Sequence, residues 1–514
     1  MQKKSEKNLR TCAGSVTLFL ALTLTIILSL IFSLLEAARM QALALIARRD
    51  LQLRLESVFG QYHVPMWENY HMLFLDGNDE KGQFNLSVLE GILMEEAALE
   101  QKEEGFYQIS LKNVEIDRFA LATDQNGKLF REQACRAMKE QLAEYAADTI
   151  KEFLSQGENL DKNSKEAEEK WKLAQEAAEQ AAQSAEKAAE SEQAGEEEAA
   201  KGGEEGTVNT RVESPPEQVL PENPMDFVQM WKKSPVLALV VENLSDISGK
   251  GISLENNVQN RKKETGNLRK TGEEKLEKLW FLQYLNTYFS CQGGSGTKGC
   301  SSHALDYELE YCISGEDTDR QNLEQTVKKL LLLREAGNFA TIMQDSGKQA
   351  LALEMATAAV GFTGIAPLIQ AVQIGILLSW SYIESVLDVR CLLAGGKVPL
   401  IKEASEWKSD VSLGQKALEK NTEQREERGF DYREYLQILL LSVKENVLVS
   451  RAMDVMEQNI RMLPGENNFS MDHMIQGMET ETVSGADSMF LGLITSVKMK
   501  DGVYHFNSRQ QFFY

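Results

Sequence analysis

The sequence has few of the residues and motifs on which enzymes and metal proteins commonly rely. It contains only 5 histidines and 6 cysteines in 514 residues, and no HExxH, CxxC or GxSxG motif. Residues 293–298 have the composition of a phosphate-binding loop but lack its Gly-Lys-Ser/Thr ending. Glu384, Asp388 and Arg390 stand at helical spacing, which is typical of ion pairs that orient helices. We therefore expect a non-enzymatic protein with no cofactor and no metal.

Positive charge is also scarce. Lys and Arg number 55 against 78 Asp and Glu, which gives a formal net charge of −23 and a pI of about 4.9. A nucleic-acid-binding protein needs a basic face, so we expect no nucleic-acid partner. The acidic balance suits a soluble outer domain.

Charge is missing altogether from residues 11–35. This run is long enough to cross a hydrocarbon core, which takes about 20 apolar residues. Lys3, Lys4, Lys7 and Arg10 precede it, and positive residues beside a membrane helix tend to stay in the cytoplasm. The pattern predicts a single-pass anchor in the cell membrane, with residues 1–10 as a cytoplasmic tail and the bulk of the chain extracellular. The alternative is a cleaved signal peptide, whose apolar region is shorter, about 7–15 residues.

A helix is expected to continue through residues 36–60 as an amphipathic stalk. No Gly or Pro interrupts residues 37–59, and Gly60 supplies a stop. An apolar stripe recurs at steps of three and four residues: Met40, Leu43, Ala47, Leu51, Leu55 and Val58. Arg39 and the other charged residues are expected mostly on other faces. The run forms either one continuous helix or a membrane helix followed, after a hinge, by a separate core helix.

Residues 157–224 are predicted to form a linker that is acidic and Ala/Glu-rich at first and then Pro-rich. Good helix formers without an apolar face cannot hold a packed position, and the heptad-spaced Leu or Ile of a coiled coil is missing. The folded parts are therefore expected at 61–156, an α/β part of the outer domain, at 225–462, which is helical, and at 463–514, the C-terminal strands.

Short alternating runs predict strands at both ends of the outer region. They occupy residues 106–121, 474–480, 490–499 and 503–513, and Ser484-Gly485 and Asp501-Gly502 divide the last three. A lone hairpin is marginally stable in water, so we predict that the runs near 106–121 and 474–513 pair in one mainly antiparallel sheet. The fold class is thus α+β, mainly helical.

Two further features leave alternatives open. Residues 355–383 carry no charge and are either a second membrane span, which would return the chain end to the cytoplasm, or a central helix pair of a helical core. Cys291 and Cys300 flank a flexible loop, where they either form a disulfide or remain free thiols.

Several longer segments resemble an uncharacterised bacterial family. They are residues 14–20, 36–39, 70–77, 305–311, 330–335, 380–390 and 395–400. That family is similar to the TadE/TadG-like pseudopilins encoded with tight-adherence (Flp-type) pilus machinery, and the resemblance implies location and context rather than chemistry. The sequence departs from the pilin pattern in one respect. Type IV pilins carry Glu at the fifth position after a cleaved Gly, whereas Phe19 stands there if Gly14 is that Gly, which puts pilin-type processing in doubt.

The resemblance implies a minor pilin-like or accessory subunit whose N-terminal helix contacts other pseudopilin or pilus-assembly proteins. Small residues along the helix would permit close approach between helices: Ala21, Ser29, Ser33, Ala37 and Ala38. We assign the membrane anchor and the assembly contacts to Ser15, Leu20, Leu24, Leu28, Leu35, Glu36 and Arg39. The alternatives are a membrane-anchored surface binding module unrelated to pili and a tethered hydrolase.

Overall fold

A computed structural model describes residues 6–95, 105–141, 224–269, 277–294, 302–409, 418, 428–490, 499–500 and 503–514. The chain folds into two compact units. Unit 1 comprises Met1–Ala137, Asn260–Glu277 and Asn459–Tyr514, and unit 2 comprises Met138–Gln259 and Lys278–Gln458. The linker expected at residues 157–224 lies outside the described residues except for Pro224.

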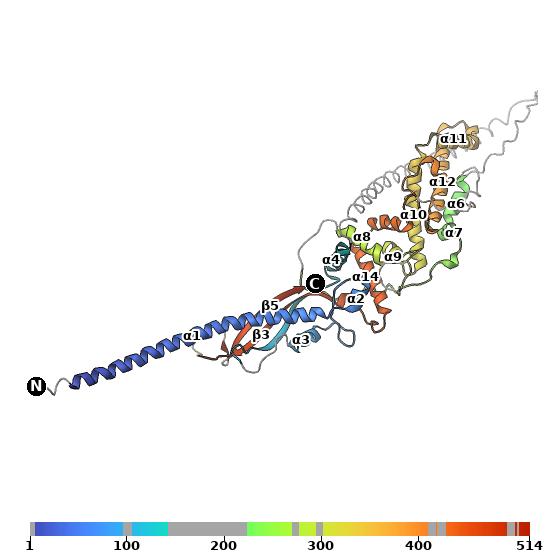
Figure 1. The fold of residues 1–514 in the computed structure, drawn as a ribbon. Coiled ribbons are helices and arrows are strands. Elements are labelled where there is room, and N and C mark those ends of the chain that lie inside the picture. Colours follow the sequence, from blue (N-terminus) through green and yellow to red (C-terminus); the bar gives the residue numbers. More distant parts are fainter. Residues whose placement is uncertain are drawn as a thin grey trace, which may run out of the picture. The chain divides into compact units, whose positions relative to one another are not determined.

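Unit 1 is organised around one uninterrupted helix. The helix α1 runs from Glu6 to Gly60, 55 residues or about 80 Å at 1.5 Å per residue. In Figure 1 it forms a single rod whose N-terminal half extends past the sheet of unit 1. The continuous-helix alternative is therefore confirmed.

The two halves of α1 differ sharply in burial. From Val16 to Leu35 every side chain is exposed or partly exposed, whereas burial begins at Glu36 and then recurs at steps of three and four residues. Five residues of the predicted stripe are almost fully buried: Leu43, Ala47, Leu51, Leu55 and Val58. The stripe prediction is confirmed, and this half packs on a sheet because the apolar residues of the stripe lie on one face.

The sheet of unit 1 is antiparallel and joins residues from both ends of the chain. Among the described residues it has five strands: β1 (Leu75–Asp76), β2 (Ser110–Leu121), β3 (Met474–Asp487), β4 (Met499–Lys500) and β5 (Val503–Phe513). β3 lies in the centre, with β2 along one side and β5 along the other, and β4 pairs with the start of β5. The predicted pairing of residues near 106–121 with 474–513 is confirmed.

One predicted strand boundary is wrong. Ser484 and Gly485 do not end a strand, since β3 continues through them and pairs Gly485 with both Ser110 and His505. Lys112 and Val503 pack close to Gly485, where a larger side chain would crowd them. The glycine therefore marks a close approach within the sheet. The predicted turn at Asp501-Gly502 lies outside the described residues.

Side-chain oxygens cap part of the outer edge of β2. The N–H of Ile116 donates to Glu90 at 3.0 Å, that of Phe119 to Asn267 at 3.1 Å, and that of Leu121 to Asp124 at 2.7 Å. Register shifts interrupt the pairing of the strand with β3. These features protect the edge against pairing with another strand.

Three shorter helices complete unit 1. They are α2 (Val64–Tyr70), α3 (Leu86–Glu95) and most of α4 (Asp124–Gln141), with a 3₁₀ turn at Met471–His473. Leu89 and Leu93 of α3 join Leu51 and Leu55 of α1 in the main core of the unit. Gln125, Asn126 and Gly127 have left-handed backbone angles at the start of α4.

Unit 2 is helical in its described residues. Its helices are α6 (Pro224–Lys233), α7 (Val236–Val240), α8 (Glu277–Tyr288), α9 (Glu308–Ser314), α10 (Asp319–Ile342), α11 (Ser346–Val360), α12 (Ala366–Leu393), α13 (Tyr432–Ser442) and α14 (Glu445–Arg461), with 3₁₀ turns at Leu244–Asp246, Gly361–Thr363 and Ala404–Glu406. α8 and α14 each extend a short way into unit 1. Trp380 and Leu377 of α12 pack with Phe339 of α10 and Ala352 of α11.

The uncharged stretch 355–383 forms a pair of helices. α11 ends at Val360, a 3₁₀ turn follows, and α12 begins at Ala366, so no single helix covers the stretch. The middle of α12 is buried within unit 2, with Ile376 and Leu377 almost inaccessible. Among the described residues, α1 alone is long and apolar enough to cross a membrane.

Candidate functional site

The exposed half of α1 is the first part of the candidate site. A window of 18 residues within it has a mean hydropathy of 2.7 and buries none of its residues in the protein. Leu20, Leu24, Leu28 and Leu35 are between 40% and 60% exposed. Ser15 lies in the same helix, but its side chain is outside the described residues. The four leucines thus share an apolar surface that the other described residues leave exposed.

A buried ion pair marks the end of this apolar surface. Arg39 Nη1 lies 3.3 Å from Glu36 Oε1, and the two side chains are 3% and 0% exposed. Arg39 also donates to the backbone oxygens of Phe106 at 2.6 Å and Asp487 at 2.8 Å, and Glu36 accepts the N–H of Met489 at 3.2 Å. The expectation that Arg39 lies off the packed face is wrong. The pair ties two distant segments to α1, and we call this group of contacts the collar.

Aromatic rings extend the collar toward the apolar half of α1. Phe490 stacks on Phe32 at a centroid distance of 5.7 Å, and Phe106 packs against Phe490 at 5.8 Å. The Arg39 guanidinium lies 6.0 Å from the centre of the Phe106 ring. The second carboxylate oxygen of Glu36 has no partner among the described residues. The collar therefore makes a fixed joint between α1 and the sheet.

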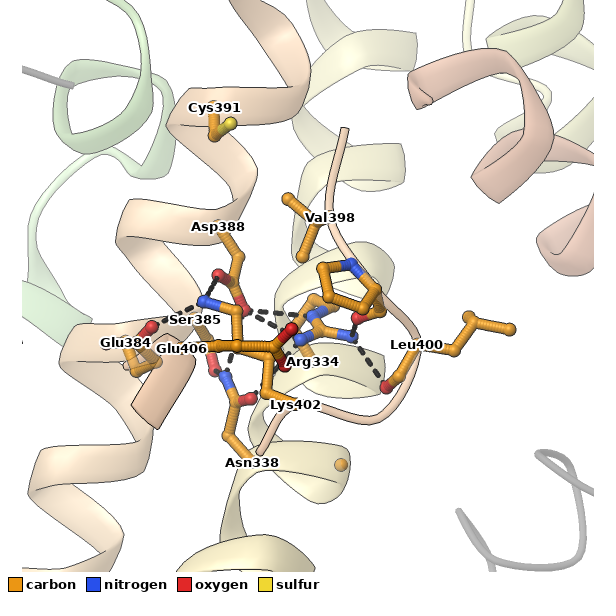
Figure 2. A network of polar contacts seen from close by, with 12 residues as sticks. Arg334, Asn338, Glu384, Ser385, Asp388, Cys391, Val398, Leu400, Lys402 and Glu406 are labelled. Carbon is orange, nitrogen blue, oxygen red and sulfur yellow. Dashed lines mark hydrogen bonds and ion pairs between the residues drawn. The ribbon is translucent and has the colours of Figure 1, made fainter. Parts of the chain in front are cut away.

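Unit 2 contains a second buried charge network, centred on Arg334 of α10 (Figure 2). Its Nε and Nη2 donate to Asp388 Oδ2 of α12 at 3.0 and 2.9 Å. Its Nη1 donates to the backbone oxygens of Pro399 and Leu400, both at 2.9 Å, and to the Tyr435 hydroxyl at 3.0 Å. One guanidinium thus joins α10 to α12, to α13 and to the segment that follows α12.

Lys402 balances the remaining charge of this network. Its Nζ lies 2.5 Å from both Glu384 Oε1 and Asp388 Oδ1, and the three side chains are almost fully buried. Burial by itself would raise the pKa of Asp388, but the charges of Arg334 and Lys402 outweigh it and hold that pKa below the usual range. Two cations and two carboxylates with satisfied partners form a structural clamp.

The sequence predicted only part of this network. Glu384 and Asp388 were expected to act in an ion pair that orients helices, but Asp388 pairs with Arg334 and Lys402 rather than with Arg390. Arg390 instead donates to the backbone oxygens of Leu239 and Leu418. Spacing along one helix cannot identify a partner on another helix.

A third buried polar group surrounds Glu310 of α9. One oxygen of its carboxylate accepts the N–H of Gln292 and the hydroxyl of Tyr432, both at 2.9 Å, and the other has no partner among the described residues. Burial raises the pKa of Glu310 to about 7. The neighbouring Glu308 accepts the N–H of Ser290 at 2.7 Å and contacts His303 Nδ1 at 2.9 Å. These contacts fix the segment after α8 against α9.

Only one of the two cysteines of the predicted disulfide lies among the described residues. Cys291 is buried and is a free thiol in the described part of the chain, and burial, with the Glu310 charge, raises its pKa to about 12. Cys300 lies outside the described residues, so the disulfide stays a prediction. No group of three His, Cys, Asp or Glu side chains within the described ranges is arranged to hold a metal ion.

Comparison with known proteins places most of unit 2 in a family. A family model described as "Family of unknown function" (DUF5702) matches residues 214–486, more than half of the 514-residue chain. The match includes Arg334, Asp388 and Lys402 of the clamp, and it includes β3 of unit 1 except for its last residue. No curated protein and no solved structure matches the chain.

Proposed function

The chain belongs to the DUF5702 family of unknown function, and we propose that it is a non-enzymatic, membrane-anchored assembly subunit. In this proposal the apolar half of α1 spans the cell membrane once, with residues 1–10 in the cytoplasm and both folded units outside. The subunit is an accessory, pilin-like component of a tight-adherence pilus system and contacts its partners through α1.

The observation that carries the proposal is the abrupt change of burial within one helix. From Val16 to Leu35 no side chain of α1 is buried by the other described residues, although Phe490 stacks on Phe32, whereas from Glu36 onward one face is packed on a sheet. An exposed apolar surface of this size is costly in water and is favourable in lipid. The four basic residues before the span support the cytoplasmic placement of the N-terminus.

Small side chains along α1 support the assembly role. Ala21, Thr25, Ser29, Ser33 and Ala37 follow one another at steps of four residues. Such positions lie near one face of a helix, and small residues there let a second helix approach closely in a bilayer. The neighbouring leucines on other faces would remain in contact with lipid.

Two substitutions test the anchor. Leu24→Asp places a charge in the middle of the span, at a cost of about 2.5–3.5 kcal/mol on insertion scales. Leu45→Asp is the matched control, because Leu45 is also exposed on α1 but lies beyond the collar. The proposal predicts that Leu24→Asp depletes the carbonate-resistant membrane fraction and that Leu45→Asp leaves it unchanged. Equal membrane yields of the two variants would contradict the anchor.

Complementation of a deletion strain tests the assembly role. Loss of surface pili on deletion, restored by the wild-type chain, supports it. Ser29→Leu combined with Ser33→Leu should fail to restore pili, because the larger side chains keep helices apart. Leu30→Ile combined with Ile31→Leu alters neighbouring faces at constant volume and should restore them. Normal piliation in the deletion strain would refute the assembly role and leave the anchor untouched.

A membrane-anchored binding module is the second candidate, and one observation favours it. Phe362 is 88% exposed at the turn between α11 and α12, and no charged residue occurs between Glu354 and Glu384. In this second proposal the exposed Phe362 ring is the point at which the ligand contacts the module. Intact pili with lost adhesion in the deletion strain, and failure of Phe362→Ser to restore adhesion, would favour this function.

A further inference from the structure

The structure assigns a lipid-contacting seat to unit 1. We infer that residues 105–107 and 488–490, which flank the collar, lie in the headgroup layer of the bilayer that α1 spans. This inference rests on the proposed anchor and adds a second membrane contact, made by the folded unit itself. Its occupant is the outer surface of the lipid bilayer.

Continuity with the span places these residues at the right height. Phe490 stacks on Phe32, and Phe32 lies four residues before Glu36, or about 6 Å along the helix axis. The uncharged run ends at Leu35, where the hydrocarbon core must also end, because Glu36 is the first charged residue. The Phe490 ring is therefore beside the last turn of the span.

The collar prevents these segments from moving away from α1. Arg39 holds the backbone of Phe106 and Asp487, and Glu36 holds the N–H of Met489. The ion pair between Glu36 and Arg39 is buried and the three backbone contacts are partly buried, so water competes with them less than at an open surface. If the helix spans the bilayer, both segments must accompany it to the interface.

The side chains exposed there have the chemistry of a bilayer interface. Tyr107 is 53% exposed and Met489 is 54% exposed, and both protrude from segments without a charged residue. Tyrosine is enriched at membrane interfaces because its ring is apolar and its hydroxyl is polar. The two segments thus present apolar and amphipathic groups next to the span, and the charged Glu104 and Asp487 directly precede them.

Photocrosslinking to lipid tests this seat in the full-length protein. Benzoylphenylalanine replaces Tyr107 or Met489 in chains reconstituted in phosphatidylcholine–phosphatidylglycerol vesicles. Leu24 is the positive control inside the span. Gln511 is the negative control, because it is exposed on β5 at the end of the sheet opposite the collar, about seven residues or 24 Å from Tyr504.

The inference predicts lipid adducts at positions 107 and 489 as abundant as at position 24, and only background at position 511. Adducts at 24 combined with background at 107 and 489 would overturn the seat and leave the anchor intact. Adducts with protein instead of lipid at 107 and 489 would also overturn it, because the surface would then have a protein partner. Background at all four positions would overturn the anchor together with the seat.

Discussion

Glu36 and Arg39, one helical turn apart on α1, form a buried ion pair at the point where the exposed half of the helix ends. Each also binds backbone from segments that are far away in the sequence. A charge pair is an expensive way to pack a helix, because both groups lose water. Its position, directly after an uncharged run, indicates that the pair fixes the sheet to the end of the apolar half of α1, which we propose spans the membrane.

Removal of the Arg39 charge should destabilise unit 1. In Arg39→Met the Glu36 carboxylate stays buried without its cation, and two backbone oxygens lose their donor. Breaking a buried pair in this way costs about 3–5 kcal/mol. Urea unfolding of the full chain in detergent measures the loss. Arg49→Met is the control, since Arg49 is exposed on the same helix, and an equal loss in both variants would contradict the structural role of the collar.

The clamp of unit 2 should respond to mutation as a coupled unit. Arg334→Met leaves Asp388 and Glu384 facing a single cation, so we expect a loss of about 3–5 kcal/mol in the free energy of unfolding. Adding Asp388→Leu should restore part of this stability, because the double variant no longer buries the unbalanced charge. Arg320→Met, at an exposed position of α10, should be neutral. Additive losses in the double variant would contradict the coupling.

Glu310 should make unit 2 less stable as the pH rises. Burial raises its folded-state pKa to about 7, so between the unfolded-state pKa and this value the folded protein binds more protons than the unfolded one. The stability is fully present below the unfolded-state pKa and is lost as the pH rises toward about 7. Burial raises the pKa of Tyr432 well above its ordinary value and that of Cys291 to about 12, so these two neighbours of Glu310 stay protonated over this range.

Glu310→Gln should remove this pH dependence, because the amide does not titrate and can still accept from Tyr432. Unfolding free energies of the two proteins at about pH 5 and about pH 8 should diverge on the order of 3 kcal/mol in their change with pH. Parallel pH profiles of the wild type and the variant would show that the Glu310 carboxyl is not the group responsible.

Local patterns in the sequence predicted the features that depend on periodicity. The stripe from Met40 to Val58 identified the packed face of α1, and the alternation near residues 106–121 and 503–513 identified strands of one sheet. Because a lone hairpin is only marginally stable in water, the strands at the two ends of the outer region were predicted to pair. Periodicity was sufficient there because a buried face leaves a regular trace in the sequence.

Individual side-chain contacts between distant residues, and the strand boundary that depends on both neighbouring strands, could not be predicted. Arg39 was expected to lie off the apolar stripe, yet its guanidinium donates to the backbone oxygen of Asp487, 448 positions away. Ser484-Gly485 carried the composition of a turn, but the two neighbouring strands hold it in the sheet. In both places tertiary contacts override the local preference.

The most direct test of the account is the sidedness of the two ends of the chain in intact cells. Asn507→Cys introduces a thiol at an exposed position of β5, and Ser5→Cys introduces one in the basic tail. A membrane-impermeant maleimide should label position 507 in intact cells and position 5 only after permeabilisation, with both variants in the membrane fraction. Labelling of position 5 but not of position 507 in intact cells would contradict the outward, single-pass topology, as would recovery of either variant in the soluble fraction.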